Sequence, residues 1–155
     1  MTITSAICNS FKQEILVEGL NFTNGTDTFK ISLYSSDSAT LNKSPTAYTA
    51  PADGTADPTN TYEVTSTSSG YTTGGNSLTS TTPVLSGDTA CCKFADTSWG
   101  SSASFTARGC LIYNSTNSNK AVCAINFGAN KTVTSGTFTI QFPAQTAGNA
   151  IIQIA

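Results

Sequence analysis

The spacing of apolar residues changes once along this chain, and the change separates a short helical start from a long β-region. Ile7, Phe11 and Ile15 recur every four residues, which places them on one face of a helix. From residue 28 onward, apolar and polar residues alternate, as they do in a strand with one buried face. This pattern predicts a β-core with a single helix at its N-terminal end.

The first segment predicts a helix over residues 4–18. Thr4 or Ser5 can cap the start of this helix, and Gly19 lies where a helix usually ends. The apolar stripe indicates a helix that closes one end of the β-core. The alternative is a helix whose apolar face docks on a neighbouring subunit.

The β-region predicts about seven antiparallel strands, separated by turns rich in Gly, Pro, Asn and Ser. The first strand is expected at 28–36, and the main β-body extends over 77–155. One helix and about seven strands are typical of a β-sandwich or barrel-like domain, so we predict a mainly β fold in a single domain, 1–155. The later strands are expected at 77–84, 89–94, 104–113, 121–127, 132–142 and 150–154, with a turn at 128–131.

A long polar loop or arm is expected between the first strand and the main β-body. Residues 42–76 lose all periodicity and are interrupted by Pro and Gly. The loop carries three tyrosines, Tyr48, Tyr62 and Tyr71. Such aromatics can form a surface for a partner or a sugar, or they can pin the loop to the body of the domain.

The strongest hairpin signal surrounds the segment NSTNSN at 114–119. If Asn114 pairs with Asn119, Cys110 lies directly opposite Cys123, where the two form either a packed thiol pair or a disulfide. Both faces of this hairpin are apolar. We therefore expect it in the centre of a sheet or covered by another chain.

Three further residues are candidates for contact with a neighbour. Arg108, the only arginine, falls on the hairpin face beside Cys110. It is either a capped charge at a sheet edge or a salt-bridge partner of another subunit. Ile152 and Ile154 belong to a C-terminal strand that needs burial, inside the sheet or against a neighbour.

The residue types argue against catalysis. The chain has no histidine, so neither a Ser-His-Asp nor a Cys-His nucleophile can be assembled. The five cysteines lack CxxC spacing, and the nine acidic residues are scattered singly in what read as turns. Asp53 and Asp57 alone supply too few oxygens for Ca²⁺. We expect no enzyme activity, no cofactor and no metal.

Charge and hydropathy restrict the partners. A net charge of −2 with no basic stripe argues against nucleic acid, and no apolar run is long enough to cross a membrane. The N-terminus lacks the basic start and apolar stretch of a secretory signal. Synthesis in a reducing cytoplasm, with free thiols, is therefore expected.

Six segments of the chain stand out together: TSAICNSFKQEIL at 4–16, DTFKISLYSS at 27–36, FADTSW at 94–99, FTARGCLIYNST at 105–116, FTIQFP at 138–143 and NAIIQIA at 149–155. Taken in this order, they resemble a family of small tailed-bacteriophage virion proteins. The resemblance covers nearly the whole chain, which departs from it in the Cys91-Cys92 pair and in the long 42–62 segment.

The resemblance implies a structural protein of the virion, made in the host cytoplasm. Its expected role is capsid decoration, in which a cement protein stabilises the shell as a homo-oligomer (trimer or dimer) bound to the major capsid protein or other virion proteins. The alternatives are a tail or neck component, or a fibre-type adhesin that binds a host-surface glycan through Trp99 and the loop tyrosines. The contact residues expected for the structural role are Ile7, Phe11, Ile15, Tyr48, Tyr62, Tyr71, Arg108, Ile152 and Ile154.

Overall fold

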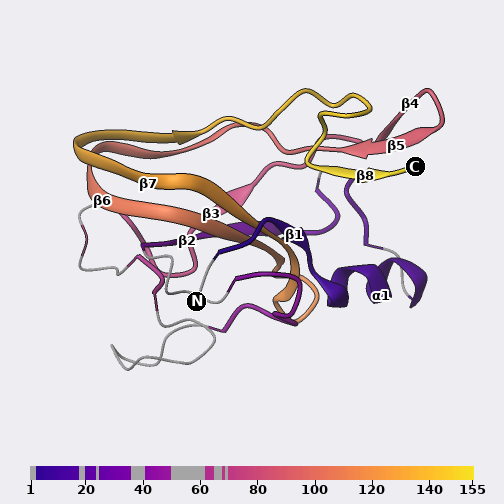
Figure 1. Cartoon of the computed structure of the whole chain (residues 1–155), viewed down its shortest axis with the longest axis horizontal. Helices are drawn as coiled ribbons and strands as arrows, with labels where there is room; N and C mark the ends of the chain where they lie inside the picture. The colour runs from indigo at the N-terminus through magenta and orange to yellow at the C-terminus, as the bar shows by residue number, and fades with distance from the viewer. Residues whose placement is uncertain are drawn as a thin grey trace.

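The fold was obtained as a computed structural model, which describes residues 3–17, 20–23, 25–35, 41–49, 62–64, 68 and 70–155. These residues form two antiparallel sheets and one short helix, which confirms the mainly β prediction (Figure 1). The five-stranded sheet has the order β1-β7-β6-β2-β3, and the three-stranded sheet the order β4-β5-β8. The elements are β1 (Ala6–Ile7), α1 (Asn9–Val17), β2 (Phe29–Tyr34), β3 (Asn76–Leu78), β4 (Val84–Ser86), β5 (Thr89–Cys92), β6 (Thr97–Asn114), β7 (Lys120–Ile140) and β8 (Ile152–Ile154).

One long hairpin, β6–β7, dominates the molecule and contributes to both of its layers. Figure 1 shows this hairpin curling back over itself at the end opposite α1. The turn predicted at 128–131 is wrong, because β7 continues through it as a bulge. Between the pairs Gly109↔Asn126 and Ala107↔Lys131, β7 uses more residues than β6, so the turn-forming residues are absorbed without reversing the chain.

The register of the hairpin also differs from the prediction. Asn114 pairs with Lys120 instead of Asn119, since the turn takes in Asn119 with a φ of 57°. A second irregularity, next to Ile112, places Cys123 opposite Ile112. The prediction that Cys110 lies directly opposite Cys123 is therefore wrong, and Cys110 pairs with Ile125.

The strand predicted at 77–84 divides between the two sheets. Its start forms β3 beside β2, its end begins β4, and Ser80 between them makes an isolated bridge to Phe94. The loop expected at 42–76 contributes two isolated bridges among its described residues, Ala47↔Lys120 and Tyr34↔Glu63.

The N-terminal segment departs from the predicted helix at 4–18. Ala6 and Ile7 form strand β1, which pairs with β7, and α1 begins only at Asn9. The hydroxyl of Ser5 accepts a hydrogen bond from the backbone N–H of Asn126 at 2.9 Å, so Ser5 is used in the sheet and not as a helix cap. The free edge of β7 offers backbone partners that the helical pattern alone does not reveal.

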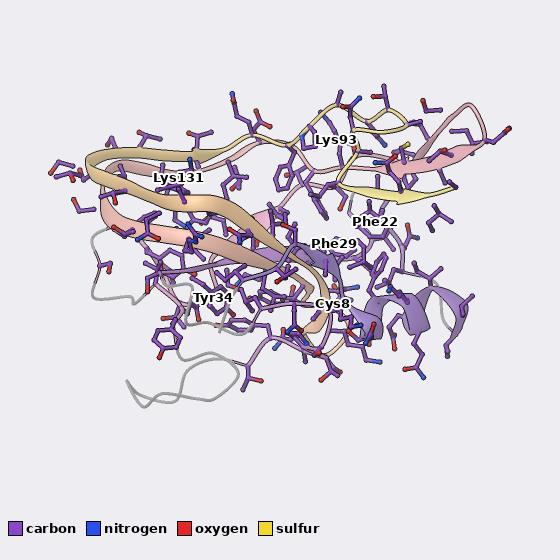
Figure 2. All side chains as sticks on the ribbon, in the orientation of Figure 1. Cys8, Phe22, Phe29, Tyr34, Lys93 and Lys131 are labelled. Atoms are coloured by element: carbon purple, nitrogen blue, oxygen red, sulfur yellow. The ribbon has the colours of Figure 1, made fainter. Side chains whose placement is uncertain are left out.

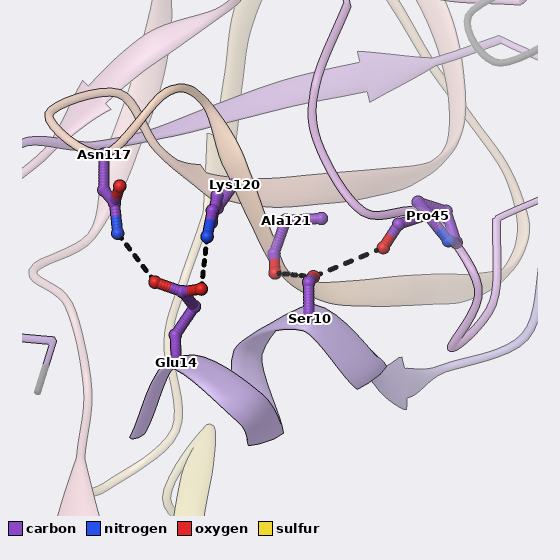
Figure 3. A network of polar contacts seen from close by, with 6 residues as sticks. All are labelled: Ser10, Glu14, Pro45, Asn117, Lys120 and Ala121. Atoms are coloured by element: carbon purple, nitrogen blue, oxygen red, sulfur yellow. Dashed lines mark hydrogen bonds and ion pairs between the residues drawn. The ribbon is translucent and has the colours of Figure 1, made fainter. Parts of the chain in front are cut away.

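Helix α1 is held on the turn of the long hairpin by polar contacts (Figure 3). Glu14 forms an ion pair with Lys120, and its second carboxylate oxygen accepts a hydrogen bond from the side-chain amide of Asn117 at 2.8 Å. One helical turn earlier, the Ser10 hydroxyl donates to the carbonyl of Ala121 at 2.9 Å. These contacts fix the helix at one end of the β-core, as its apolar stripe predicts.

The core lies on both faces of the five-stranded sheet. Between the two layers, Phe22 stacks on Phe29 with ring centroids 4.6 Å apart, and both are labelled in Figure 2. On the other face, a second cluster includes Tyr34 and Cys8. Near its turn, at 109–114 and 121–124, the hairpin is buried on both faces by its own chain. Strand β2 is likewise buried on both sides instead of one, with Ser32 fully buried. Among the described residues, no helix is long and apolar enough to span a membrane.

Candidate interaction surface

Glu63, in the long loop, is a buried acidic residue at the centre of a hydrogen-bond network. It is 5% exposed, and its carboxylate accepts hydrogen bonds from the Tyr48 hydroxyl at 3.0 Å, the Tyr71 hydroxyl at 2.7 Å and the Gly74 N–H at 2.6 Å. Burial, together with the charge of Glu63, raises the pKa of both tyrosines far above its usual value. The tyrosines therefore stay neutral and act as donors.

This network fastens the loop to the sheet. The Tyr71 hydroxyl also accepts a hydrogen bond from the backbone N–H of Leu33 in β2 at 3.0 Å. Tyr48 stacks on Tyr113 of β6, with ring centroids 4.3 Å apart, and the Tyr113 hydroxyl donates to the carbonyl of Gly74. Tyr48 and Tyr71 thus pin the loop to the body, which corrects the expectation that they face a partner.

Glu63 is the residue that the sequence analysis missed. Single acidic residues in such a sequence are typical of turns, where they bond their own backbone. Glu63 instead accepts hydrogen bonds from Tyr48, Tyr71 and Gly74. A signal was present in its neighbours, because Tyr62 and Val64 flank it with residues typical of strands. Glu63 indeed makes a strand-like bridge to Tyr34.

All five cysteines are free thiols. Cys110 and Cys123 are buried in the same cluster between the layers, as a packed pair without a bond between them. Burial raises the pKa of both thiols well above its usual value, and it raises the pKa of Cys8 to about 11. Because the thiolate is the nucleophile, these buried cysteines are poor candidates for chemistry.

The described residues contain no group of three or more His, Cys, Asp or Glu side chains that could hold a metal ion. Asp53 and Asp57 lie outside the described residues. Trp99 is 3% exposed and packs between Tyr71, Phe105 and Phe138, so it is a core anchor and not a stacking platform for a sugar.

The expected contact residues fall into three groups. Those that pack inside the chain are Phe11, Tyr48, Tyr71 and Ile152, which corrects their assignment to a partner surface. Those that are half-buried are Ile7, Ile15, Tyr62 and Arg108. Within the described part of the chain, Arg108 has no ion-pair partner. Ile154 is 52% exposed, so the expected burial of the C-terminal strand holds for Ile152 alone.

Exposed large hydrophobic side chains gather at one end of the molecule, where α1 and the three-stranded sheet lie (Figure 1). The most exposed is Leu16 of α1, at 86%, followed by Leu85 of β4, at 76%. The set described at this end is Leu16, Val17, Val84, Leu85 and Ile154. Exposed apolar side chains gathered at one end of a molecule are typical of sites of interaction with other macromolecules.

An apolar groove runs between α1 and the three-stranded sheet. Its cavity volume is about 200 Å³, and its lining includes Ile15, Pro83 and Ile154. In the three-stranded sheet, Leu85 pairs with Ala90 and Ala90 pairs with Ile154, so the side chains of Leu85, Ala90 and Ile154 lie in one row across the sheet. This row is on the face that lines the groove, because Ala90 and Ile154 are part of the lining. We call this groove, with the exposed Leu16, Val17, Leu85 and Ile154, the apolar end.

A second hollow opens between the layers along the edge of β7. It has a volume of about 460 Å³ and is lined by aromatic and aliphatic side chains, among them Phe127, Phe138 and Ile151, with Lys131 as its charged residue. It is larger than the groove of the apolar end, but its hydrophobic side chains are mostly half-buried.

Comparison with known proteins adds no relative to these observations. No protein-family model matches the chain, and no curated protein or solved structure shows significant similarity to it. The functional reasoning below therefore rests on the residues and their arrangement.

Proposed function

We propose that this protein is a structural component of a tailed-bacteriophage virion, and that it decorates and cements the capsid shell. The observation that carries this proposal is the apolar end, where side chains as exposed as Leu16 and Leu85 surround a groove on a rigid β-body. A cement protein needs surface of this kind because it works by contact alone. The sequence resemblance to small virion proteins supports a virion protein as the partner in this contact.

The mechanism is burial of apolar area across seams between shell subunits. Interface cores are depleted in charge, and only 10% of this chain is charged. Each contact stabilises the shell modestly, and many symmetry-related copies multiply the effect. The proposed partners are the major capsid protein or other virion proteins, and the proposed location is the assembled virion.

The test is the copy number of this protein in purified virus particles, measured by quantitative peptide mass spectrometry. A number of copies comparable with that of the major shell protein is expected. A handful of copies per particle would contradict decoration and favour the neck or tail, where the same kind of contact surface is needed. Absence from the particle would contradict a virion role altogether.

The glycan-binding adhesin is the weaker alternative. Of its four proposed stacking residues, Trp99, Tyr48 and Tyr71 are buried and present no aromatic face to a sugar. Tyr62 is half-buried. Binding of the isolated protein to a glycan array would nevertheless revive it.

A further inference from the structure

We propose that two copies of this chain meet along the β8 edge of the apolar end, with strand β8 of one copy pairing antiparallel to β8 of the other. The rest of the apolar end is left for the contact with the shell. The inference rests on the proposed function, because it makes a two-fold symmetric dimer the unit that acts in the virion. The physical grounds are the edge position of β8, its sequence and the uncharged lining of the groove beside it.

Strand β8 is an edge strand without the side chains that usually block edge pairing. In the described chain, β5 is its only strand neighbour. Edge strands of monomeric proteins are normally blunted by short length, a lysine, a proline, a bulge or a covering segment. Strand β8 is short, at 3 residues, but it has no lysine, proline or bulge. The residues of β8 are Ile152, Gln153 and Ile154, with neither charge nor proline, and their pairing with β5 is regular.

The sequence of β8 is complementary to itself. Isoleucine, glutamine and isoleucine read the same in both directions, so an antiparallel pair centred on Gln153 places Ile152 of one copy opposite Ile154 of the partner subunit. Both isoleucines point to the groove side of the sheet, because both line the groove. The pairing therefore joins two apolar rows into one continuous surface around a two-fold axis, which is the commonest symmetry of soluble oligomers.

The surroundings of β8 favour a second copy over a charged partner. The exposed side chains Leu16, Val17, Leu85 and Ile154 are all uncharged, and the groove lining contains no acidic or basic residue. Its one ionisable group, the Cys92 thiol, has a pKa raised by burial and is neutral. Along the described lining of the groove, two copies thus bring no like charges together, and a charged partner would find no counter-charge there.

The first test is the mass of the full-length protein in solution, measured by light scattering after size exclusion over a range of concentrations. We expect a dimer for the natural sequence and for Thr137→Lys, which adds the same charge at an exposed position of β7 outside the apolar end. Ile154→Lys should be a monomer, with far-ultraviolet circular dichroism unchanged. Leu85→Lys should stay a dimer, because Leu85 lies on β4 at the opposite edge of the sheet. A natural sequence that stays monomeric, or a dimer that survives Ile154→Lys, overturns the proposal.

The second test places a reporter on the proposed axis. Residue 153 of each copy faces its own equivalent, so Gln153→Cys should yield a disulfide-linked dimer on mild oxidation, seen by electrophoresis without reductant. Gln153→Ser is the matched control, since it also removes the side-chain bonds of Gln153 to Gly148 and Ala150. A dimer in solution that Gln153→Cys does not cross-link would show contact through another surface and refute β8 pairing.

These outcomes are separable from the fate of the proposed function. A monomeric protein with a high copy number in particles would remove the two-fold contact and leave decoration standing. A dimer present in only a few copies per particle would do the reverse.

Discussion

The buried carboxylate of Glu63 provides the sharpest test of how the long loop is held. Glu63→Ala removes the common acceptor of the Tyr48 hydroxyl, the Tyr71 hydroxyl and the Gly74 N–H. All three donors are buried, and the substitution leaves them without that acceptor. The loop then loses the acceptor that joins three of its own residues and orients Tyr71 and Gly74 for their bonds to Leu33 of β2 and Tyr113 of β6.

The expected magnitude follows from the cost of unpaired buried donors. Each costs about 1–3 kcal/mol, and the Tyr48 hydroxyl, on a side chain 7% exposed, can recover part of this cost from water. We therefore expect Glu63→Ala to lower the free energy of unfolding by about 3–5 kcal/mol. Glu63→Gln keeps the shape and one acceptor oxygen, so its loss should be less than half as large.

The assay is urea unfolding at pH 7, followed by the fluorescence of Trp99. Trp99 is the only tryptophan, and its ring lies 6.2 Å from that of Tyr71, so it reports on this part of the core. With a urea dependence of about 2 kcal/mol per molar, the midpoint should fall by roughly 1.5–2.5 M. Asp88→Ala, which removes an exposed acid from a turn, is the control and should leave the midpoint nearly unchanged.

A result within about 1 kcal/mol of the natural protein for Glu63→Ala would refute this reasoning. It would mean that the three donors find water or other acceptors without loss. A Glu63→Gln protein more stable than the natural one would show that burying the charge costs more than its hydrogen bonds return.

Three further predictions concern titration, reactivity and backbone geometry. The pKa of Glu14 is lowered from its ordinary 4.5 by its hydrogen bond to Lys120, so the stability that it contributes is present above pH 4.5 and lost as the pH falls through the lowered value; Glu14→Gln should remove that part of an acid-unfolding curve. Iodoacetamide at pH 8, followed by peptide mass spectrometry, should leave Cys123 unmodified in the folded protein, and labelling as fast as in urea would contradict its burial. Gly75→Ala should lower the thermal midpoint far more than Gly25→Ala, because both have positive φ but only at position 75 would the added carbon collide with backbone, at the carbonyl of Ile31.

The sequence pattern was sufficient to predict the fold class but not the register of the strands. Alternation over 28–36 and the turn at 114–119 located β2 and the long hairpin, because these signals are local. The positions of the bulges in the hairpin depend on how two long strands curve around a core, and the sequence near Ile112 does not indicate a bulge. Two shifts of one residue each, at the turn and next to Ile112, moved Cys123 from the position opposite Cys110 to the position opposite Ile112.

The candidate surface was predictable only in part, for a similar reason. Of the stripe Ile7, Phe11 and Ile15, only Phe11 and Ile15 lie on the helix, and Ile7 belongs to strand β1. The face that Phe11 and Ile15 form is largely occupied by the chain's own core. The most exposed apolar residue on the helix is Leu16, which the four-residue spacing placed outside the stripe. Whether an apolar side chain faces its own core or a partner depends on tertiary packing, which periodicity does not record.

The long hairpin has a consequence for how this protein bears load. Since β6 and β7 run from one layer of the sandwich into the other, the two layers are joined by continuous backbone as well as by side-chain contacts (Figure 1). A force that pulls the layers apart must straighten two hydrogen-bonded strands at once, and cannot simply slide one sheet over the other. A domain built in this way transmits strain from one layer to the other through its backbone, so the two layers resist separation together.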